Sequence, residues 1–144
     1  MISILNIGKV KYDEFDEVWA IVRSMKYENP RIKQVQRLSP SPELFHKYLN
    51  LKAAGNWNKE SFDNIYVPKF LHDIRYGDER GFEVLNELYK LDKQGKKIAL
   101  CCFCPEESLC HRSIVAGLLQ AVGCNVVIPS KKDYSKYYDM YKSL

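Results

Sequence analysis

Residues 97–122 read KIALCCFCPEESLCHRSIVAGLLQAV and combine an apolar strand, a polar loop and an apolar helix. Ile98 to Cys102 is continuously apolar, which is typical of a strand buried on both faces of a parallel sheet. A loop from Phe103 to Cys110 follows. Ser113 to Val122 is apolar on nearly every side, which predicts a buried helix that ends at Gly123. A buried strand that leads through a loop into a helix is a building unit of α/β folds.

Strand and helix patterns alternate on both sides of this unit. We expect strands at residues 2–7, 31–37 and 125–128, and helices at residues 12–25, 41–54, 58–75 and 78–94. No internal repeat or linker interrupts the pattern. The alternation predicts one α/β domain spanning residues 1–144, with a mainly parallel sheet flanked by helices in a three-layer sandwich.

The helix assignments rest on capping residues and on apolar spacing. Ser41 can cap one helix, with Pro42 at its first position. Asn58 or Ser61 can cap the next helix, which Pro68 can break or kink. The inward face of the 12–25 helix is expected to carry Phe15, Val18, Trp19 and Val22, and that of the 78–94 helix Phe82, Leu85, Leu88, Tyr89 and Leu91.

The composition is that of an ordinary globular protein. Of the 144 residues, 46% are hydrophobic and 28% are charged, which argues against intrinsic disorder. The 7 glycines and 6 prolines exclude a collagen-like or low-complexity chain. No apolar run approaches the ~18–20 residues that a membrane span needs. The first residues have no basic segment of the kind that opens a signal peptide, so we expect a cytoplasmic protein without a membrane partner.

The charge balance permits an anionic partner without requiring one. There are 22 Lys and Arg residues against 18 Asp and Glu residues, which gives a net charge of +4. Residues 131–144 mix tyrosines with lysines, as segments that stack on bases and contact phosphates do. The same composition is found in a short helix docked on a domain. Nucleic acid is therefore a weakly supported partner.

Cysteine is the informative residue type. Cys101, Cys102, Cys104 and Cys110 fall within ten residues, and the fifth cysteine is Cys124. An odd number of clustered cysteines in a chain without a signal peptide indicates reduced thiols rather than a disulfide scaffold. The cluster favours thiol chemistry or a metal site, while Cys101 and Cys124 are expected to be small buried hydrophobic residues.

The placement of Cys102, Cys110 and His111 suggests a catalytic site. Cys102 ends the predicted strand, and ligands of open α/β sheets bind outside the carboxyl ends of the strands. Cys110 and His111 open the next helix, whose amino end lowers the pKa of a nearby thiol. We expect Cys102 or Cys110 to be a nucleophile and His111 to be a general acid/base or an orienting residue.

The same helix start is expected to bind an anion. Arg112 presents a fork of donors suited to phosphate or carboxylate, and Ser113 lies beside it. Arg37 follows the second predicted strand and is expected to reach the same sheet edge as a second anion clamp. The predicted ligand is therefore a small anion, phosphorylated or nucleotide-like.

A metal site is the competing interpretation of the cysteine loop. Cys102, Cys104, Cys110 and His111 are four soft ligands that suit zinc or an iron–sulfur centre. However, Cys110 and His111 are adjacent, which makes them an awkward pair on one ion. Cys102 and Cys104 are also separated by one residue rather than by the usual two. The residues alone assign no cofactor.

The pattern Cys102-x7-Cys110-His111-Arg112-Ser113-x2-Ala116 resembles the signature of the domain-of-unknown-function 488 (DUF488) family. The run from Leu38 to Leu44 is similar to a helix start found in a branch of that family, and residues 4–8 resemble its first strand and glycine. The resemblance implies the α/β fold and places Gly8 among the expected ligand-binding residues. It carries no settled activity. The branch also has an aromatic helix that corresponds here to Trp57, Phe62, Tyr66 and Leu71.

Four positions depart from the family pattern. Cys104 replaces an acidic residue, and Gly117 replaces a helix glutamate. Before Arg37, Val35 and Gln36 stand where the family has an aspartate and a valine. If those carboxylates act as acids or bases in relatives, Glu106 or Glu107 would have to take their place here.

These observations lead to one main hypothesis and two alternatives. The main hypothesis is a small enzyme that binds an anionic ligand at the Cys-His-Arg helix start and uses thiol chemistry. The first alternative is a non-catalytic module that binds nucleic acid or protein. The second is a zinc-binding protein.

Overall fold

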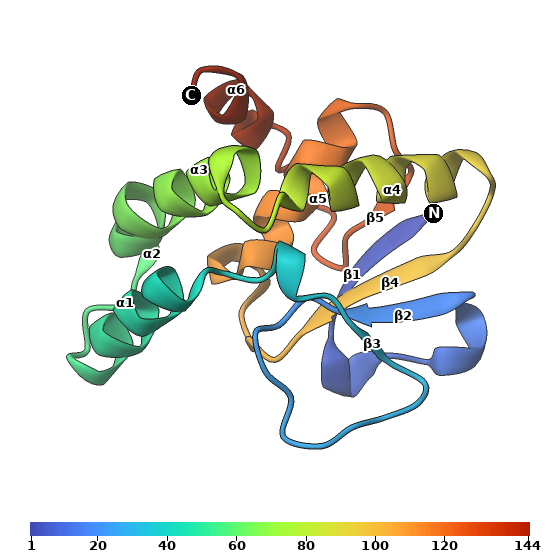
Figure 1. Cartoon of the computed structure of the whole chain (residues 1–144), viewed down its shortest axis with the longest axis horizontal. Coiled ribbons are helices and arrows are strands. Elements are labelled where there is room, and N and C mark those ends of the chain that lie inside the picture. The colour runs from blue at the N-terminus through green and yellow to red at the C-terminus, as the bar shows by residue number, and fades with distance from the viewer.

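The computed structural model describes all 144 residues and is built on a five-stranded, all-parallel sheet (Figure 1). The strand order is β3-β2-β4-β1-β5. The strands are β1 (Ile2–Asn6), β2 (Glu17–Ala20), β3 (Lys33–Gln34), β4 (Ile98–Cys102) and β5 (Val126–Val127). The helices are α1 (Pro42–Ala53), α2 (Lys59–Ser61), α3 (Val67–Tyr76), α4 (Gly81–Lys93), α5 (His111–Ala121) and α6 (Lys136–Lys142).

Strand β4 lies at the centre of the sheet, as its apolar sequence predicted. It pairs with β1 on one side and β2 on the other, and every one of its residues is buried. Its alternate residues face opposite layers. Ile98 and Leu100 pack into the main core with the helices, whereas Ala99 and Cys101 pack on the other face of the sheet. The prediction that Cys101 is a buried hydrophobic residue is confirmed.

The three-layer α/β architecture is confirmed, but the two outer layers differ. Helices cover one face of the sheet, and α5 is buried from residue 111 to residue 119. The other face is covered by the short 3₁₀ turns Ile7–Lys9 and Tyr12–Glu14 and by apolar residues around them. No helix of the structure is long and apolar enough to cross a membrane.

The predicted helix over residues 12–25 is wrong. This segment forms the 3₁₀ turn Tyr12–Glu14 and strand β2. Val18 to Val22 is a continuous run of buried residues, and Trp19 is 1% exposed. A strand buried on both faces carries apolar residues at every position, so it also satisfies the spacing of an amphipathic helix. Packing against β4 decides the outcome.

Pro68 interrupts the predicted 58–75 helix. Asn58 caps α2, with a reciprocal hydrogen bond between the Asn58 and Ser61 side chains and backbones. Residues 62–66 then form a π-helical turn before α3 begins. Proline has no amide hydrogen, and its ring collides with the carbonyl four residues earlier in a regular helix. The wider turn relieves both problems.

Helix α4 shows one error in the expected inward face. Val84 and Leu88 are buried, whereas Tyr89 is 40% exposed and the ammonium of Lys93 lies 5.2 Å from its ring centre. The fully buried residues are 81, 84 and 88, and the predicted Leu85 and Leu91 pack against the core while partly buried.

We expect Gly117→Ala to destabilise the protein by about 1–3 kcal/mol, a typical cost of overpacking. A Cβ atom at Gly117 would lie 2.0 Å from the carbonyl oxygen of Tyr134, in the segment that leads into α6. Alanine normally stabilises a helix interior by about 1 kcal/mol relative to glycine. At this position we therefore expect alanine to lower the free energy of unfolding rather than to raise it. Urea unfolding of the variant measures this change.

The control is Ala121→Gly at the exposed end of the same helix, which should cost no more than about 1 kcal/mol. A Gly117→Ala protein as stable as the wild type would contradict the close approach of the two segments.

Candidate thiol site

The cysteine loop runs from the carboxyl end of β4 to the amino end of α5. From the neighbouring strand β1, the Asn6 side chain donates hydrogen bonds to the carbonyl oxygens of Phe103 (3.4 Å) and Cys104 (3.0 Å). These contacts fix the first half of the loop against the sheet.

Glu107 fixes the second half of the loop. Its carboxylate accepts hydrogen bonds from the Tyr134 hydroxyl (2.6 Å), from the Ser130 backbone amide (3.3 Å) and from the Ser130 hydroxyl. These bonds lower the pKa of Glu107 although burial opposes the effect. Glu107 therefore serves as an anchor for the loop, whereas Glu106 is exposed.

Cys102 and Cys110 form a closely spaced thiol pair. Their Sγ atoms are 2.8 Å apart, and each residue is 1% exposed. Both cysteines are free thiols and pack with Ala20 and Val22. The structure thus brings together the two residues that the sequence suggested as nucleophiles.

Arg112 supplies a buried positive charge to this pair. Its Nη1 atom donates to Cys102 Sγ at 3.0 Å and to the Cys104 carbonyl oxygen at 2.8 Å. The residue is 4% exposed, and its buried Nε atom has no hydrogen-bond partner. A buried cation is costly unless an anion lies beside it. A Cys102 thiolate meets this requirement.

The pKa values of the three neighbouring thiols diverge. Hydrogen bonds from Cys104 and Cys110, with the positive charge of Arg112 nearby, hold the pKa of Cys102 well below its usual range. The hydrogen bond that Cys104 gives to Cys102 raises the pKa of Cys104 to about 11. Burial raises the pKa of Cys110 well above its usual range. The site therefore holds one thiolate beside two thiols.

His111 has a defined orientation. Its Nε2 atom lies 2.6 Å from the carbonyl oxygen of Ile21, which can only accept a hydrogen bond, so Nε2 carries the proton. Its Nδ1 atom faces Cys110 Sγ at 3.7 Å. Burial lowers the pKa of His111 and favours the neutral ring. The Nδ1 lone pair is thus directed at the Cys110 thiol.

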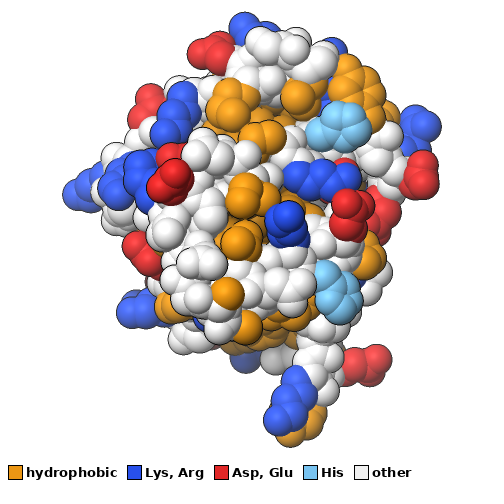
Figure 2. Space-filling view, turned by 90° about the vertical axis from the view of Figure 1, so that its left-hand side faces the viewer, with side chains coloured by type: hydrophobic (Ala, Val, Ile, Leu, Met, Phe, Trp, Pro, Cys, Tyr) orange, Lys and Arg blue, Asp and Glu red, His pale blue; other side chains and the backbone are white.

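A cavity of about 280 Å³ opens beside the thiols. Cys102, Cys110 and His111 line it, together with Cys104 from the loop. Figure 2 shows the side of the molecule that carries α1, where hydrophobic side chains gather between charged ones. The other walls are mainly aromatic and come from Phe45, Tyr48, Trp57 and Tyr66.

The aromatic walls are tightly packed. The ring centres of Tyr48 and Trp57 are 4.7 Å apart at an angle of 89°, and those of Trp57 and Tyr66 are 5.5 Å apart. Such edge-to-face contacts hold the rings in fixed positions. The cavity therefore offers a rigid surface for a flat, apolar group.

Two cationic residues also line the cavity, but only one has a free charge. Arg23 donates to both carboxylate oxygens of Glu79 and to the Pro40 carbonyl oxygen. Lys52 is exposed, forms no ion pair, and has the Tyr48 hydroxyl 3.5 Å from its Nζ atom. Lys52 is thus the available anion-binding group at the cavity wall.

Several predicted ligand-binding residues lie elsewhere. Arg37 follows the edge strand β3 and donates to the carbonyl oxygens of Glu79 (2.7 Å) and Arg80 (2.9 Å), so it fixes the start of α4 and does not reach the thiols. Ser113 is fully buried, and its hydroxyl donates to the Cys110 carbonyl oxygen. Gly8 is exposed in a 3₁₀ turn and does not line the cavity.

The sequence interpretation missed the residues that shape the cavity. Phe45, Tyr48 and Lys52 are spaced so that they lie along one face of α1, which was a detectable signal. Trp57 follows that helix and was expected as part of the aromatic helix of the resembling family branch. The contribution of Arg23 was not detectable, because it depends on the loop after β2.

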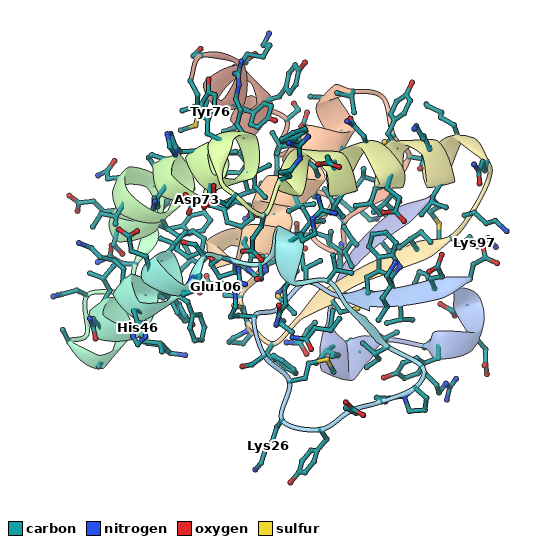
Figure 3. The ribbon with its side chains drawn as sticks, in the orientation of Figure 1. Lys26, His46, Asp73, Tyr76, Lys97 and Glu106 are labelled. Atoms are coloured by element: carbon teal, nitrogen blue, oxygen red, sulfur yellow. The ribbon has the colours of Figure 1, made fainter.

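Figure 3 shows two exposed residues, Lys26 at the tip of that loop and His46 on α1.

Three of the four expected zinc ligands lie close together, but their two sulfurs are nearer to each other than the sulfurs on a bound zinc ion are. The ligand atoms of Cys102, Cys110 and His111 lie within 4.8 Å of one another, without Cys104. Tetrahedral zinc with bonds of about 2.3 Å holds two sulfurs about 3.8 Å apart. Here the sulfurs are 2.8 Å apart, and the cationic Arg112 already contacts one of them. The arrangement fits a thiol pair with an arginine counter-ion.

The tyrosines of the 131–144 segment pack against the rest of the protein rather than project into solvent. Tyr134 and Tyr137 are buried in the main core, and the Arg75 guanidinium donates to the Tyr141 carbonyl oxygen at 2.6 Å. The segment forms α6, which packs against α3 and α5 (Figure 1). The rings of Tyr134 and Tyr137 are therefore not free to stack on bases.

We expect the thiolate absorbance of this protein to persist well below pH ~8.5, the ordinary cysteine pKa. Cys104→Ala removes the foremost hydrogen bond to Cys102, so the titration midpoint should move to higher pH. Ultraviolet titration of both proteins measures the difference. Cys124→Ala removes a buried thiol outside the site and should leave the midpoint unchanged. A wild-type midpoint near 8.5 would contradict a charged Cys102.

One family model matches most of the chain. The DUF488-N3a model, described as the active DUF488-N3 subclade, matches residues 2–123. The matched range contains β1 to β4, the cysteine loop and α5, and it stops before β5 and α6. No curated protein and no solved structure matches the chain. The match extends over more than half of the sequence, so the chain belongs to the DUF488 family.

Proposed function

We propose that this protein is a small enzyme in which the Cys102 thiolate attacks an anionic, nucleotide-like ligand held in the aromatic cavity. The observation that carries the proposal is the position of Cys102. Its sulfur accepts a hydrogen bond from the buried Arg112 and also lines the cavity. A charged sulfur at the wall of a cavity is a nucleophile with a binding site beside it.

The surroundings of Cys102 support the nucleophile assignment. The thiolate, and not the thiol, is the attacking form of cysteine. Arg112 favours that form through its hydrogen bond to the sulfur, and the same nitrogen also donates to the Cys104 carbonyl oxygen. Arg112 does not line the cavity, so in this proposal it stabilises the nucleophile and leaves ligand binding to other groups.

The cavity supports a small ligand with a flat ring and an anionic group. Its volume of about 280 Å³ is at the lower end of ligand pockets, which span roughly 300–1,000 Å³. Trp57 and Tyr48 offer aromatic surface for a flat ring. Lys52 supplies the free positive charge for a phosphate or carboxylate.

We expect Cys102 to react with the anionic reagent iodoacetate in preference to the neutral reagent iodoacetamide, because the free charge of Lys52 at the cavity wall attracts the anion. Lys52→Gln should reduce this preference several-fold, and Glu79→Gln, which frees the charge of Arg23, should increase it. Site-resolved mass spectrometry of the alkylated protein measures both rates.

Lys47→Gln is the matched control, because Lys47 is exposed on the same helix but does not line the cavity. Equal effects of Lys47→Gln and Lys52→Gln would show that net charge rather than the cavity attracts the reagent. A Cys102 that reacts with neither reagent would contradict its role as nucleophile.

We further expect the purified protein to contain no stoichiometric zinc, since the sulfur spacing and Arg112 suit a thiol pair. Elemental analysis of the protein purified without chelator measures the metal content. A chelator should leave the alkylation rate of Cys102 unchanged. Labelling that begins only after chelation would instead favour the zinc alternative.

A further inference from the structure

We propose that Cys102 and Cys110 act together in thiol–disulfide exchange with a small disulfide substrate. Cys102 attacks the substrate, and Cys110 then releases the bound half by forming a disulfide with Cys102. This inference rests on the proposed function in one respect, which is that Cys102 is the nucleophile.

The spacing of the two sulfurs carries the proposal. They are 2.8 Å apart and enclosed by apolar residues. A disulfide requires about 2.05 Å, so bond formation needs a small approach of two side chains. Cys102 ends β4 and Cys110 begins α5, so two packed elements hold the pair in place. Cys101 and Cys124 pack in other clusters and cannot replace either partner.

The reaction balances with the groups present. The Cys102 thiolate attacks one sulfur of RS–SR, forms Cys102–S–SR and releases RS⁻. The Cys110 thiol transfers its proton to Nδ1 of His111, which faces it at 3.7 Å, and attacks Cys102 Sγ. The second RS⁻ leaves, and the proton passes from His111 to it. Two molecules of a low-molecular-weight thiol, R′SH, then reduce the protein disulfide and become R′SSR′.

His111 is suited to this step by its orientation. The hydrogen bond from Nε2 to the Ile21 carbonyl oxygen fixes the ring and leaves Nδ1 free to take a proton. Cys104 also lines the cavity, but its sulfur has no imidazole or carboxylate within hydrogen-bond distance, whereas that of Cys110 has His111. The geometry therefore distinguishes Cys110 from Cys104 as the resolving thiol.

The cavity defines the substrate class. A disulfide must reach Cys102 past the aromatic walls and Lys52, which favours a small disulfide that carries an anionic group and a flat ring. The compound 5,5′-dithiobis(2-nitrobenzoate) has these properties, and each half absorbs visible light once it is released. It is therefore a suitable probe.

The test compares the wild type with Cys110→Ala and Cys104→Ala. In the wild type, both halves of the probe should be released for each Cys102 that reacts, leaving no adduct on Cys102. Cys110→Ala should release one half and retain the other on Cys102. Cys104→Ala keeps the resolving thiol, so it should still release both halves for each Cys102 that reacts, although Cys102 itself reacts more slowly at low pH. Cys124→Ala lies outside the site and is the matched control that should behave as the wild type. Absorbance and intact-protein mass measure release and retention.

A second measurement does not depend on any variant. After reaction, the unfolded wild-type chain is cut by a protease specific for glutamate, which cleaves at Glu106 and Glu107 between the two cysteines. The fragments that contain Cys102 and Cys110 should remain joined until a reductant is added. Fragmentation spectra assign the bonded cysteines.

The outcomes separate this inference from the proposed function. If wild-type Cys102 keeps the probe, or if Cys104 is the residue bonded to it, the pairing with Cys110 is wrong while Cys102 remains a nucleophile. If Cys102 does not react with the probe or with iodoacetate, both proposals are wrong.

Discussion

The contact between the buried guanidinium of Arg112 and the sulfur of Cys102 is the constraint around which the site is arranged. Arg112 is almost fully enclosed, and its Nη1 atom reaches only Cys102 Sγ and the Cys104 carbonyl oxygen. A cation in this position requires an anion, and no carboxylate lies within ion-pair distance of it. The negative charge of the Cys102 thiolate therefore offsets part of the free-energy cost of burying Arg112. The charge of Arg112 in turn favours the ionised form of Cys102, which is the form that the proposed reaction needs.

The sheet and α5 place the reactive groups without help from flexible segments. Parallel strands bring the ends of β1, β2 and β4 to one edge, where Asn6 fixes the loop and Ile21 orients His111. Cys110 and His111 then enter with the first residues of α5, which is buried along most of its length. Because each group belongs to a packed element or is tied to one, the distances among them are set by the core.

The sequence predicted the centre of this arrangement better than its surroundings. The apolar run of β4 and the nearly uniform apolarity of α5 required burial, so the place of Cys102, Cys110 and Arg112 between them followed from local pattern. Strand β2 was mistaken for a helix, because a strand buried on both faces lacks the alternation of apolar and polar residues that identifies a strand. Arg37 was expected at the site, but β2 lies between β4 and the strand that Arg37 follows. In addition, its guanidinium donates hydrogen bonds to backbone oxygens at the start of α4. The pairing of Arg23 with Glu79 joins residues 56 positions apart, which no local pattern reports.

Residues 124–144 lie outside the part of the chain that matches the family model, yet they contact the site. Ser130 and Tyr134 hold Glu107, which fixes the cysteine loop just before Cys110. Tyr134 also passes over α5 at Gly117, where the family pattern has a glutamate and where no side chain would fit. The absence of a side chain at Gly117 therefore allows the final segment to cross the helix and reach the loop. In this chain Glu107 and the final segment together anchor the cysteine loop. The position of the thiol pair therefore depends on having glycine at residue 117, in place of the helix glutamate of the family pattern.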